Sequence, residues 1–176
     1  MKKIIAICGY SGSGKSYLCK ILKSKGYVVI PSSEVVLSKI EEEIKDIKSL
    51  SEEERLKKAE EYLKVNPSLP SRAMFEAIKN IKEEIIFIDG VKSHKDLSFV
   101  KDFKIIFVEN PFEKRFELIK KFKNKYITKS TLLKRDEFDK KIGLDLLRKK
   151  ADFVIENNNI SEDEVENIIN RIKRNN

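Results

Sequence analysis

One glycine-rich stretch near the N-terminus contains the residues with the clearest chemical potential. It consists of Gly9, Tyr10, Ser11, Gly12, Ser13, Gly14, Lys15 and Ser16, and it matches the pattern G-x-x-x-x-G-K-[ST] in full. Glycines let the backbone bend so tightly that successive N–H groups point at phosphate oxygens, and a following helix adds its positive end. The stretch therefore predicts a P-loop that binds the phosphates of a nucleotide such as ATP.

Individual side chains extend this predicted chemistry. Lys15 is expected to reach the β- and γ-phosphates and to act in catalysis, and the Ser16 hydroxyl is expected to hold Mg²⁺. Tyr17 completes the predicted nucleotide-binding set. Asp89 follows the apolar run IIFI (85–88), and a carboxylate at the end of a buried parallel strand lies beside a bound ligand. An Asp-Gly pair alone is also a common turn. Its combination with the P-loop favours a catalytic, Mg²⁺-holding role for Asp89.

Short apolar runs alternate along the chain with segments in which apolar residues recur at helical spacing. Strands are expected at 3–8, 27–30, 85–88, 105–108 and 153–157. Continuous apolar runs are typical of parallel strands that are covered on both faces. The alternation predicts an α/β fold, with a parallel five-stranded sheet flanked by helices, in one domain that spans residues 1–176.

Capping residues indicate where the expected helices begin. These residues are Gly14, Ser32 or Ser33, Ser51 with Glu54, Pro70, Pro111, a position near Asp136, and Ser161 with Glu164. A further helix is expected between the third and fourth strands. The helix from Ser32 or Ser33 is expected to run through Ile47, and Gly26 is expected to end the helix that follows the P-loop. Residues 120–135 are basic and weakly periodic, which predicts a mobile segment.

The charge of the chain indicates the kind of partner it prefers. A net charge of +8 and a pI of about 9.3 favour anions, and residues 114–150 are rich in Lys and Arg. The aromatic residues there, Phe116, Phe122, Tyr126 and Phe138, fit helix packing about as well as base stacking, so nucleic-acid binding stays an alternative. Because mononucleotide phosphates already explain positive charge around a cleft, we expect small nucleotides rather than nucleic acid as partners.

The remaining composition excludes several other classes of protein. Cys8 and Cys19 are too few for a disulfide framework, and their spacing does not suggest zinc. Cys8 is expected to be a small buried side chain, and His94 a surface residue at a helix start. No apolar run reaches bilayer length and no cleavage site follows the first run, which predicts a cytoplasmic protein without membrane contact. Monomer and homodimer both stay open.

Several segments together resemble a known kinase group. GYSGSGKS, IIFIDGVKS, NPFEKRFELIKKFKNK, KRDEFD and ADFVIEN occur in this order and span nearly the whole chain. The chain resembles P-loop kinases of the nucleoside monophosphate kinase and dephospho-CoA kinase group, especially an archaeal dephospho-CoA-kinase-like set. The resemblance implies a P-loop NTPase three-layer sandwich, with a helical acceptor-binding insert at about 32–82 and a lid at about 120–138. It also implies Mg²⁺-dependent transfer of the ATP γ-phosphate to a nucleotide-like acceptor.

The same resemblance assigns expected roles to five further residues. Arg135 matches the catalytic arginine of the lid, and Arg115 matches a nucleotide-binding arginine in the preceding helix. Arg72 is expected to clamp the phosphate of the acceptor. Lys92 matches a basic residue after the Asp-Gly pair, and Glu34 an acidic residue after the second strand, both on the acceptor side. Each of these side chains is equally compatible with a solvated surface position.

Two features leave the acceptor and the class of function open. The acceptor-side segment SEVVLSKIEEE lacks the arginine that similar kinases have there, and Lys121, Lys123 and Lys125 occupy lid positions where arginine is common. A P-loop ATPase or a nucleotide-dependent switch without a small-molecule acceptor is the alternative. The sequence contains no N-K-x-D motif for reading a base, which disfavours the switch.

Overall fold

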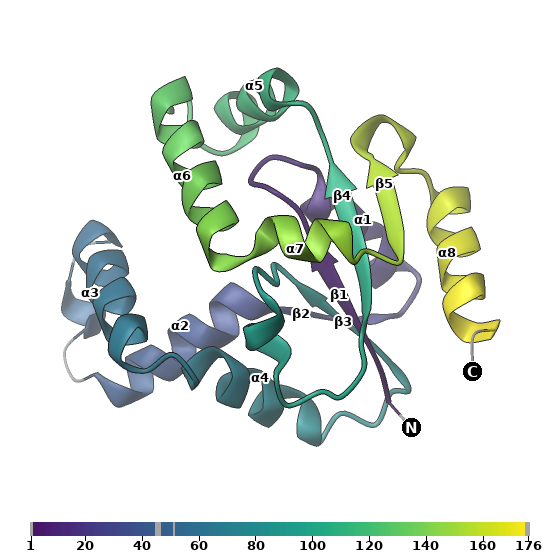
Figure 1. The fold of residues 1–176 in the computed structure, drawn as a ribbon, viewed down its shortest axis with the longest axis horizontal. Helices are drawn as coiled ribbons and strands as arrows, with labels where there is room; N and C mark the ends of the chain where they lie inside the picture. Colours follow the sequence, from purple (N-terminus) through teal and green to yellow (C-terminus); the bar gives the residue numbers. More distant parts are fainter. Residues whose placement is uncertain (1, 45–46, 51, 175–176) are drawn as a thin grey trace.

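A parallel sheet of five strands forms the centre of the computed structural model, which describes residues 2–44, 47–50 and 52–174 (Figure 1). The strands are β1 (Lys3–Cys8), β2 (Val28–Pro31), β3 (Ile85–Asp89), β4 (Lys104–Glu109) and β5 (Phe153–Glu156), in the order β2-β3-β1-β4-β5. All neighbouring strands run parallel, with Ile7 opposite Asp89 in the register of β1 and β3. The predicted fold class is confirmed, and β1, which leads into the glycine-rich loop, is the central strand.

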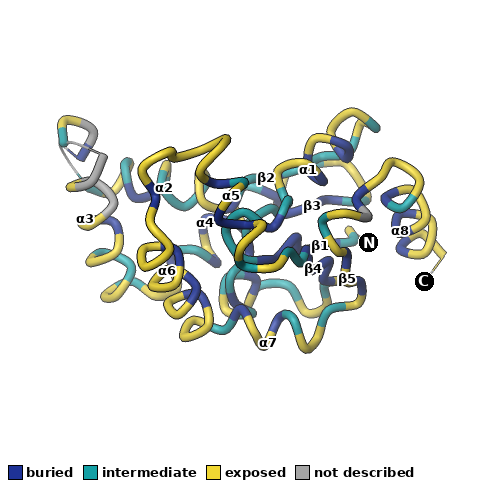
Figure 2. The backbone as a smooth tube through the Cα atoms, turned by 90° about the horizontal axis from the view of Figure 1, so that it is seen from above, coloured by how far each residue is buried: buried dark blue, intermediate teal, exposed yellow. Residues whose placement is uncertain are grey.

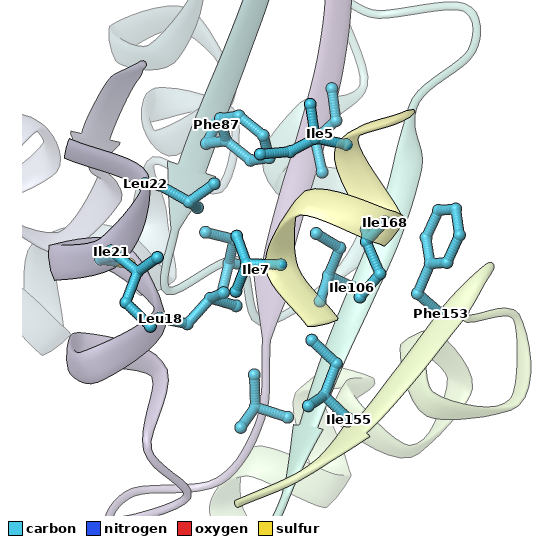
Figure 3. Packing of buried hydrophobic residues seen from close by; sticks show 14 of the residues in the cluster. Ile5, Ile7, Leu18, Ile21, Leu22, Phe87, Ile106, Phe153, Ile155 and Ile168 are labelled. Carbon is cyan, nitrogen blue, oxygen red and sulfur yellow. The ribbon is translucent and has the colours of Figure 1, made fainter. Parts of the chain in front are cut away.

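Helices cover both faces of the sheet because side chains of the central strand alternate between two apolar cores. Ile5 and Ile7 pack with α1 (Lys15–Ser24) and α8 (Glu162–Arg174) on one face, as Figure 3 shows for the first of these helices with Leu18 and Leu22. On the other face, α4 (Leu69–Lys79) and α7 (Leu144–Lys149) pack on the remaining β1 side chains, with Met74 and Leu147 among the buried residues. The central strand is therefore fixed from both sides, and so is the loop that follows it.

A helical segment lies between β2 and β3 and has a small core of its own. It comprises α2 (Ser32–Glu43), a 3-10 turn η1 (Ile47–Ser49), α3 (Glu52–Val65) and α4. Ile40, Ile47, Ala59 and Leu69 form this core. Helix α3 is largely exposed and lies at the opposite end of the molecule from α8 (Figure 2).

The expected helix from Ser32 or Ser33 to Ile47 was too long. Helix α2 ends at Glu43, because Ile44 adopts extended backbone angles and Ile47 begins the short 3-10 turn. The capping box expected at Ser51 lies outside the described residues.

Helices α5 (Phe112–Phe122) and α6 (Lys129–Ile142) stand over the loop that follows β1 (Figure 1). The helix expected to begin near Asp136 begins seven positions earlier, at Lys129, so much of the segment 120–135 is helical. Thr128 caps this helix by accepting a hydrogen bond from the Thr131 N–H at 3.1 Å. The buried residues of α6 are Leu132, Asp136 and Asp139, so its inward face is acidic and its apolar periodicity is weak.

The connection between β3 and β4 also differs from the prediction. It contains only the 3-10 turn η2 (His94–Leu97), which a capping box between Ser93 and Asp96 begins. His94 is half-buried rather than on the surface, its ring lies 5.1 Å from the Phe103 ring, and burial lowers the pKa of His94.

Several local expectations are confirmed. Gly26 follows α1 with a φ of +82°, and the Ser161 hydroxyl accepts from the Glu164 N–H at the start of α8. Cys8 and Cys19 are buried free thiols. A short 3-10 turn, η3 (Asn157–Asn159), follows β5. Within the described part of the chain, no helix combines the length and apolar character needed to cross a membrane.

Candidate active site

The loop from Gly9 to Ser16 is a tight turn between β1 and α1 that only glycine permits at three positions. Gly9, Gly12 and Gly14 have φ angles of +144°, +79° and +109°. A Cβ atom on Gly9 would lie 2.4 Å from the Val108 carbonyl oxygen, and one on Gly14 would lie 2.0 Å from Asn157 Nδ2. The spacing of the glycines thus reflects both the backbone angles and the close approach of β4 and of Asn157, which follows β5.

Neighbouring strand ends hold this loop in shape. Asn157, directly after β5, donates from Nδ2 to the Ser13 carbonyl oxygen at 2.9 Å. The Ser13 N–H donates to the Tyr10 carbonyl oxygen at 3.1 Å. No motif in the sequence points to Asn157, although it ends the run ADFVIEN that carried part of the resemblance. The loop is therefore preorganised before any ligand binds.

Lys15 is a half-buried cation that folds back onto the loop. Its Nζ donates to the carbonyl oxygens of Gly9 at 2.7 Å and Tyr10 at 3.0 Å. Burial, followed by the charge of the nearby Lys92, lowers the pKa of Lys15 to about 8. A polyphosphate at the loop would supply the negative charge that this ammonium lacks.

Unpartnered polar atoms gather around the loop. Across the described residues, four buried side-chain N or O atoms have no hydrogen-bond partner, and three of them are Ser13 Oγ, Asp89 Oδ1 and Asn110 Nδ2. Buried polar groups are nearly always paired in folded proteins. These atoms therefore indicate a site whose polar partners arrive with a ligand.

The residues expected to hold Mg²⁺ have suitable positions. Ser16 is exposed at the N-terminus of α1, and Asp89 ends β3 beside Ile7 of β1. Residues 2–44, 47–50 and 52–174 contain no group of three or more His, Cys, Asp or Glu side chains that could hold a metal ion. Mg²⁺ typically uses one or two protein oxygens and takes its other ligands from phosphates and water, so the assignment of Ser16 and Asp89 to Mg²⁺ stays a prediction.

Arg115 is a buried link between α5, α6 and the loop. It is 5% exposed and donates to the Ser11 carbonyl oxygen at 3.0 Å and, from Nε, to the Asn110 carbonyl oxygen at 3.2 Å. Its two terminal nitrogens form a bidentate pair with Asp136 at 3.0 Å and 2.5 Å, and its guanidinium lies 5.2 Å from the centre of the Tyr10 ring. The structure thus shows a bracing role, while nucleotide binding by Arg115 stays a prediction.

A cavity of about 500 Å³ opens on one side of the loop, between the ends of β4 and β5. We call it the β4–β5 cavity. Its lining residues are Tyr10, Ser13, Phe107, Val108, Glu109, Asn110, Pro111, Lys114, Arg115, Asp145, Arg148, Glu156, Asn157 and Asn158. On its α7 side, the Tyr10 hydroxyl bonds to Asp145 and Arg148 pairs with Glu109. Burial and this hydrogen bond raise the pKa of Tyr10 well above its usual range.

A second cavity, of about 460 Å³, opens on the other side of the loop, between α3 and α6. We call it the α3–α6 cavity. It is lined by Ser11, Glu60, Lys92, Thr131, Lys134, Arg135, Phe138 and Asp139. Two residues singled out from the sequence, Lys92 and Arg135, meet here beside the P-loop residue Ser11. Asp139 was missed, although its spacing from Leu132 and Asp136 places all three on one helical face.

Two other predicted acceptor residues lie elsewhere. Glu34 lines a separate hollow with Lys39 and Glu76, and Arg72 is exposed on α4. Neither belongs to the described lining of the α3–α6 cavity. The linear order of the sequence did not reveal this separation.

Other proteins resemble this chain over most of its length. The profile of a family described as "AAA domain" matches residues 5–142. A UPF0200 protein of Sulfurisphaera tokodaii is 32% identical over 178 residues, which cover 97% of each chain. This chain belongs to the UPF0200 family. The matched range of the AAA-domain profile contains the P-loop, Asp89, Arg115, Lys92 and Arg135 of this UPF0200 member.

Solved structures show which fold this UPF0200 chain shares. TT1252 from Thermus thermophilus has a TM-score of 0.68 at 23% identity, covering 98% of this chain and 96% of that one. Shikimate kinase from Acinetobacter baumannii, solved in complex with shikimate, has a TM-score of 0.61 at 16% identity, covering 99% and 95%. The chain therefore has a P-loop kinase-like fold. The narrower likeness to dephospho-CoA kinases stays a prediction.

Proposed function

We propose that the chain is a Mg²⁺-dependent phosphotransferase that moves the γ-phosphate of ATP to a nucleotide-like acceptor. The acceptor would be a nucleoside or deoxynucleoside monophosphate, or dephospho-CoA. One observation supports this most: the P-loop lies between two cavities, with Ser13 lining the β4–β5 cavity and Ser11 lining the α3–α6 cavity. A kinase needs such an arrangement, because donor and acceptor must approach the transferred phosphoryl group from opposite sides.

The donor side would be formed by the P-loop and the β4–β5 cavity. Backbone N–H groups from Gly9 to Ser16 would surround the β- and γ-phosphates, and Lys15 would leave its carbonyl partners to contact them. Ser16 and Asp89 would hold Mg²⁺, which supplies neutralisation of the phosphate charge. The base and ribose have room in the β4–β5 cavity.

The acceptor side would be the α3–α6 cavity. Lys92, Lys134 and Arg135 bring three positive charges to it, against the carboxylates of Glu60 and Asp139. An oxygen of the acceptor attacks the γ-phosphorus, and the bond to the β–γ bridging oxygen breaks, so that ADP leaves. The guanidinium of Arg135 would stabilise the charge that spreads over the phosphoryl oxygens.

The class of acceptor decides whether a base is needed. A phosphate acceptor attacks with an oxygen that is already ionised, so no base is required. A hydroxyl acceptor would need a group to accept its proton, and of the two candidates only Asp89 adjoins the P-loop, since Glu34 lies in a separate hollow. Because Asp89 is already assigned to Mg²⁺, this favours an acceptor that reacts through a phosphate.

An acceptor screen tests the proposal. Purified protein with Mg²⁺ and either ATP or GTP would be supplied with each nucleoside monophosphate, each deoxynucleoside monophosphate and dephospho-CoA in turn, and ADP or GDP formation would be followed. We expect at least one acceptor to raise turnover by roughly tenfold or more over the acceptor-free rate. Equal turnover with and without every acceptor would instead support the ATPase or switch alternative.

A further inference from the structure

Lys92 and Asp139 form an ion pair inside the α3–α6 cavity. The distance from Lys92 Nζ to Asp139 Oδ2 is 2.5 Å, and the carboxylate side chain is 9% exposed against 34% for the ammonium side chain. Both residues line the cavity beside Arg135. A cation well placed for an acceptor phosphate thus already has an anionic partner.

Lys92 is anchored at its backbone while its side chain can change partner. The N–H groups of Lys92 and Ser93 both donate to Asp96 Oδ2 at 2.9 Å, within the capping box of η2. Within the described part of the chain, the side chain bonds through Nζ to one carboxylate, that of Asp139 on α6. A new anion in the cavity could therefore take the ammonium without any change in the β3–η2 turn.

The charge of Lys92 also reaches the P-loop. Among charged groups, Lys92 contributes most to lowering the pKa of Lys15. Lys92 lines the same cavity as the P-loop residue Ser11, on the side of the loop where donor and acceptor would meet. A phosphate in that cavity would be attracted by the Lys92 ammonium group.

We propose that Asp139 is an internal competitor for the acceptor phosphate, holding Lys92 until a phosphate oxygen displaces it. This deepens the proposed function and rests on it. A carboxylate and a phosphate offer an ammonium group the same kind of oxygen acceptor, and a phosphate dianion carries more charge. An uncharged acceptor has no group that can replace Asp139. The exchange thus selects acceptors that carry a phosphate over neutral alcohols.

A binding experiment tests this exchange without reading turnover. The donor site would be saturated with Mg²⁺ and the β,γ-imido analogue of ATP, and inorganic phosphate would be titrated by calorimetry. We expect Asp139→Asn to bind phosphate about three- to tenfold more tightly than wild type, because an ion pair of intermediate exposure is removed. Lys92→Met in the same background should abolish that gain.

Glu113→Gln provides the matched control. It changes the net charge by the same amount and breaks the ion pair with Lys129, which lies outside the α3–α6 cavity lining. An equal gain in this variant would attribute the effect to net charge alone and overturn the proposal. Unchanged or weaker phosphate binding by Asp139→Asn would also overturn it, because Asp139 would then only orient Lys92.

A second measurement uses the wild-type chain, so it does not depend on the folding of a variant. The carboxyl carbon of Asp139 would be followed by ¹³C NMR during the same phosphate titration. We expect its resonance to shift as Lys92 leaves, and a resonance that stays constant would contradict the exchange. Phosphate binding and the Asp139 resonance are both measured without acceptor-stimulated turnover. A failure of the proposed exchange at Lys92 is therefore distinguishable from a failure of the proposed kinase function.

Discussion

The protonation of Lys15 should change when a phosphate binds at the P-loop. Its pKa is lowered from 10.5 to about 8, first by burial and then by Lys92. The lowered value means that the unfolded chain binds more protons between pH 8 and 10.5, so this residue makes stability rise with pH across that window. Bound triphosphate reverses the effect, because it favours the charged ammonium.

This reversal predicts proton uptake when ATP binds. About half of Lys15 should be neutral at pH 8 in the free protein, so binding should take up as much as ~0.5 proton there and less at pH 7. Calorimetry in buffers of different ionisation enthalpy measures this number. Lys15→Ala should remove the uptake, weaken ATP binding and abolish turnover, whereas Lys20→Ala, an exposed lysine on the same helix, should behave as wild type.

Arg135 is expected to act mainly in the transition state. It is exposed at the α3–α6 cavity, where a guanidinium could meet the transferring phosphoryl group. Arg135→Ala should lower kcat about 10²- to 10³-fold, with little change in the Kd for ATP. Steady-state kinetics and ATP titration measure the two quantities, and Lys140→Ala, on an exposed position of α6, is the control. A parallel loss of ATP affinity would mean that Arg135 binds the ground state.

At the scale of elements, α6 is joined to α5 by the ion pair of Asp136 with Arg115, beside a small apolar cluster that includes Leu132. Arg115 and Asp136 are 5% and 7% exposed, and Arg115 also donates to the Ser11 carbonyl oxygen. Removing one partner of such a pair leaves a buried charge without compensation, which is more costly than losing both. The position of Arg135 over the cavity therefore depends on its neighbour Asp136.

Asp136→Ala should accordingly destabilise the protein by about 3 kcal/mol, because the Arg115 guanidinium would remain buried without its carboxylate. Urea unfolding measures the change. Glu137→Ala, at the exposed neighbouring position, should change the unfolding free energy by less than ~0.5 kcal/mol. A loss below about 1 kcal/mol for Asp136→Ala would show that water or another group compensates Arg115.

Helix α6 shows which features of the structure could not be predicted from the sequence. The strands were placed within one residue, because continuous apolar runs are a local signal, and the P-loop was complete in eight consecutive residues. Helix α6 was misjudged because Asp136 and Asp139 replace apolar residues on its buried face. Their partners, Arg115 and Lys92, are 21 and 47 positions away, and Asn157 bonds the P-loop from 144 positions away. Such pairings exist only in the folded chain.

At the scale of the whole molecule, the donor side and the acceptor side of the site rest on apolar cores of different size. The P-loop follows the central strand and lies above cores that are fully buried on both faces of the sheet. Helix α3, which brings Glu60 to the α3–α6 cavity, rests on a small apolar cluster and is otherwise largely exposed. The acceptor side is therefore expected to open more easily than the donor side.

Hydrogen exchange should show this difference. Amides of α3 are expected to exchange through local opening, well before those of β1 exchange by global unfolding. A bound acceptor that spans the α3–α6 cavity should slow exchange in α3, in the presence of Mg²⁺ and the imido analogue of ATP. Uniform protection of α3 and β1 in the free protein would contradict this account of the acceptor side.

Exposed aromatic rings with lysines near them lie on the basic surface formed by α5, α6 and the residues between these helices. Phe116 is buried, while Phe122 and Tyr126 are 69% and 79% exposed, with lysine ammonium groups about 5 Å from their ring centres. These lysines, Lys121 and Lys125, are two of the three at positions where the resemblance predicts lid arginines. They extend positive charge from the P-loop outward, which would raise the rate at which anionic nucleotides are captured.

The most direct test of the central claim follows the phosphoryl group itself. ATP carrying ¹⁸O in its γ-phosphate would be incubated with Mg²⁺, the wild-type chain and the acceptor that stimulates turnover most, and the products would be resolved by mass spectrometry. We predict that the labelled phosphoryl group appears on the acceptor in a one-to-one ratio with ADP, and that Arg135→Ala slows its transfer. Label recovered as inorganic phosphate, at a rate independent of the acceptor, would contradict the assignment of the chain as a kinase.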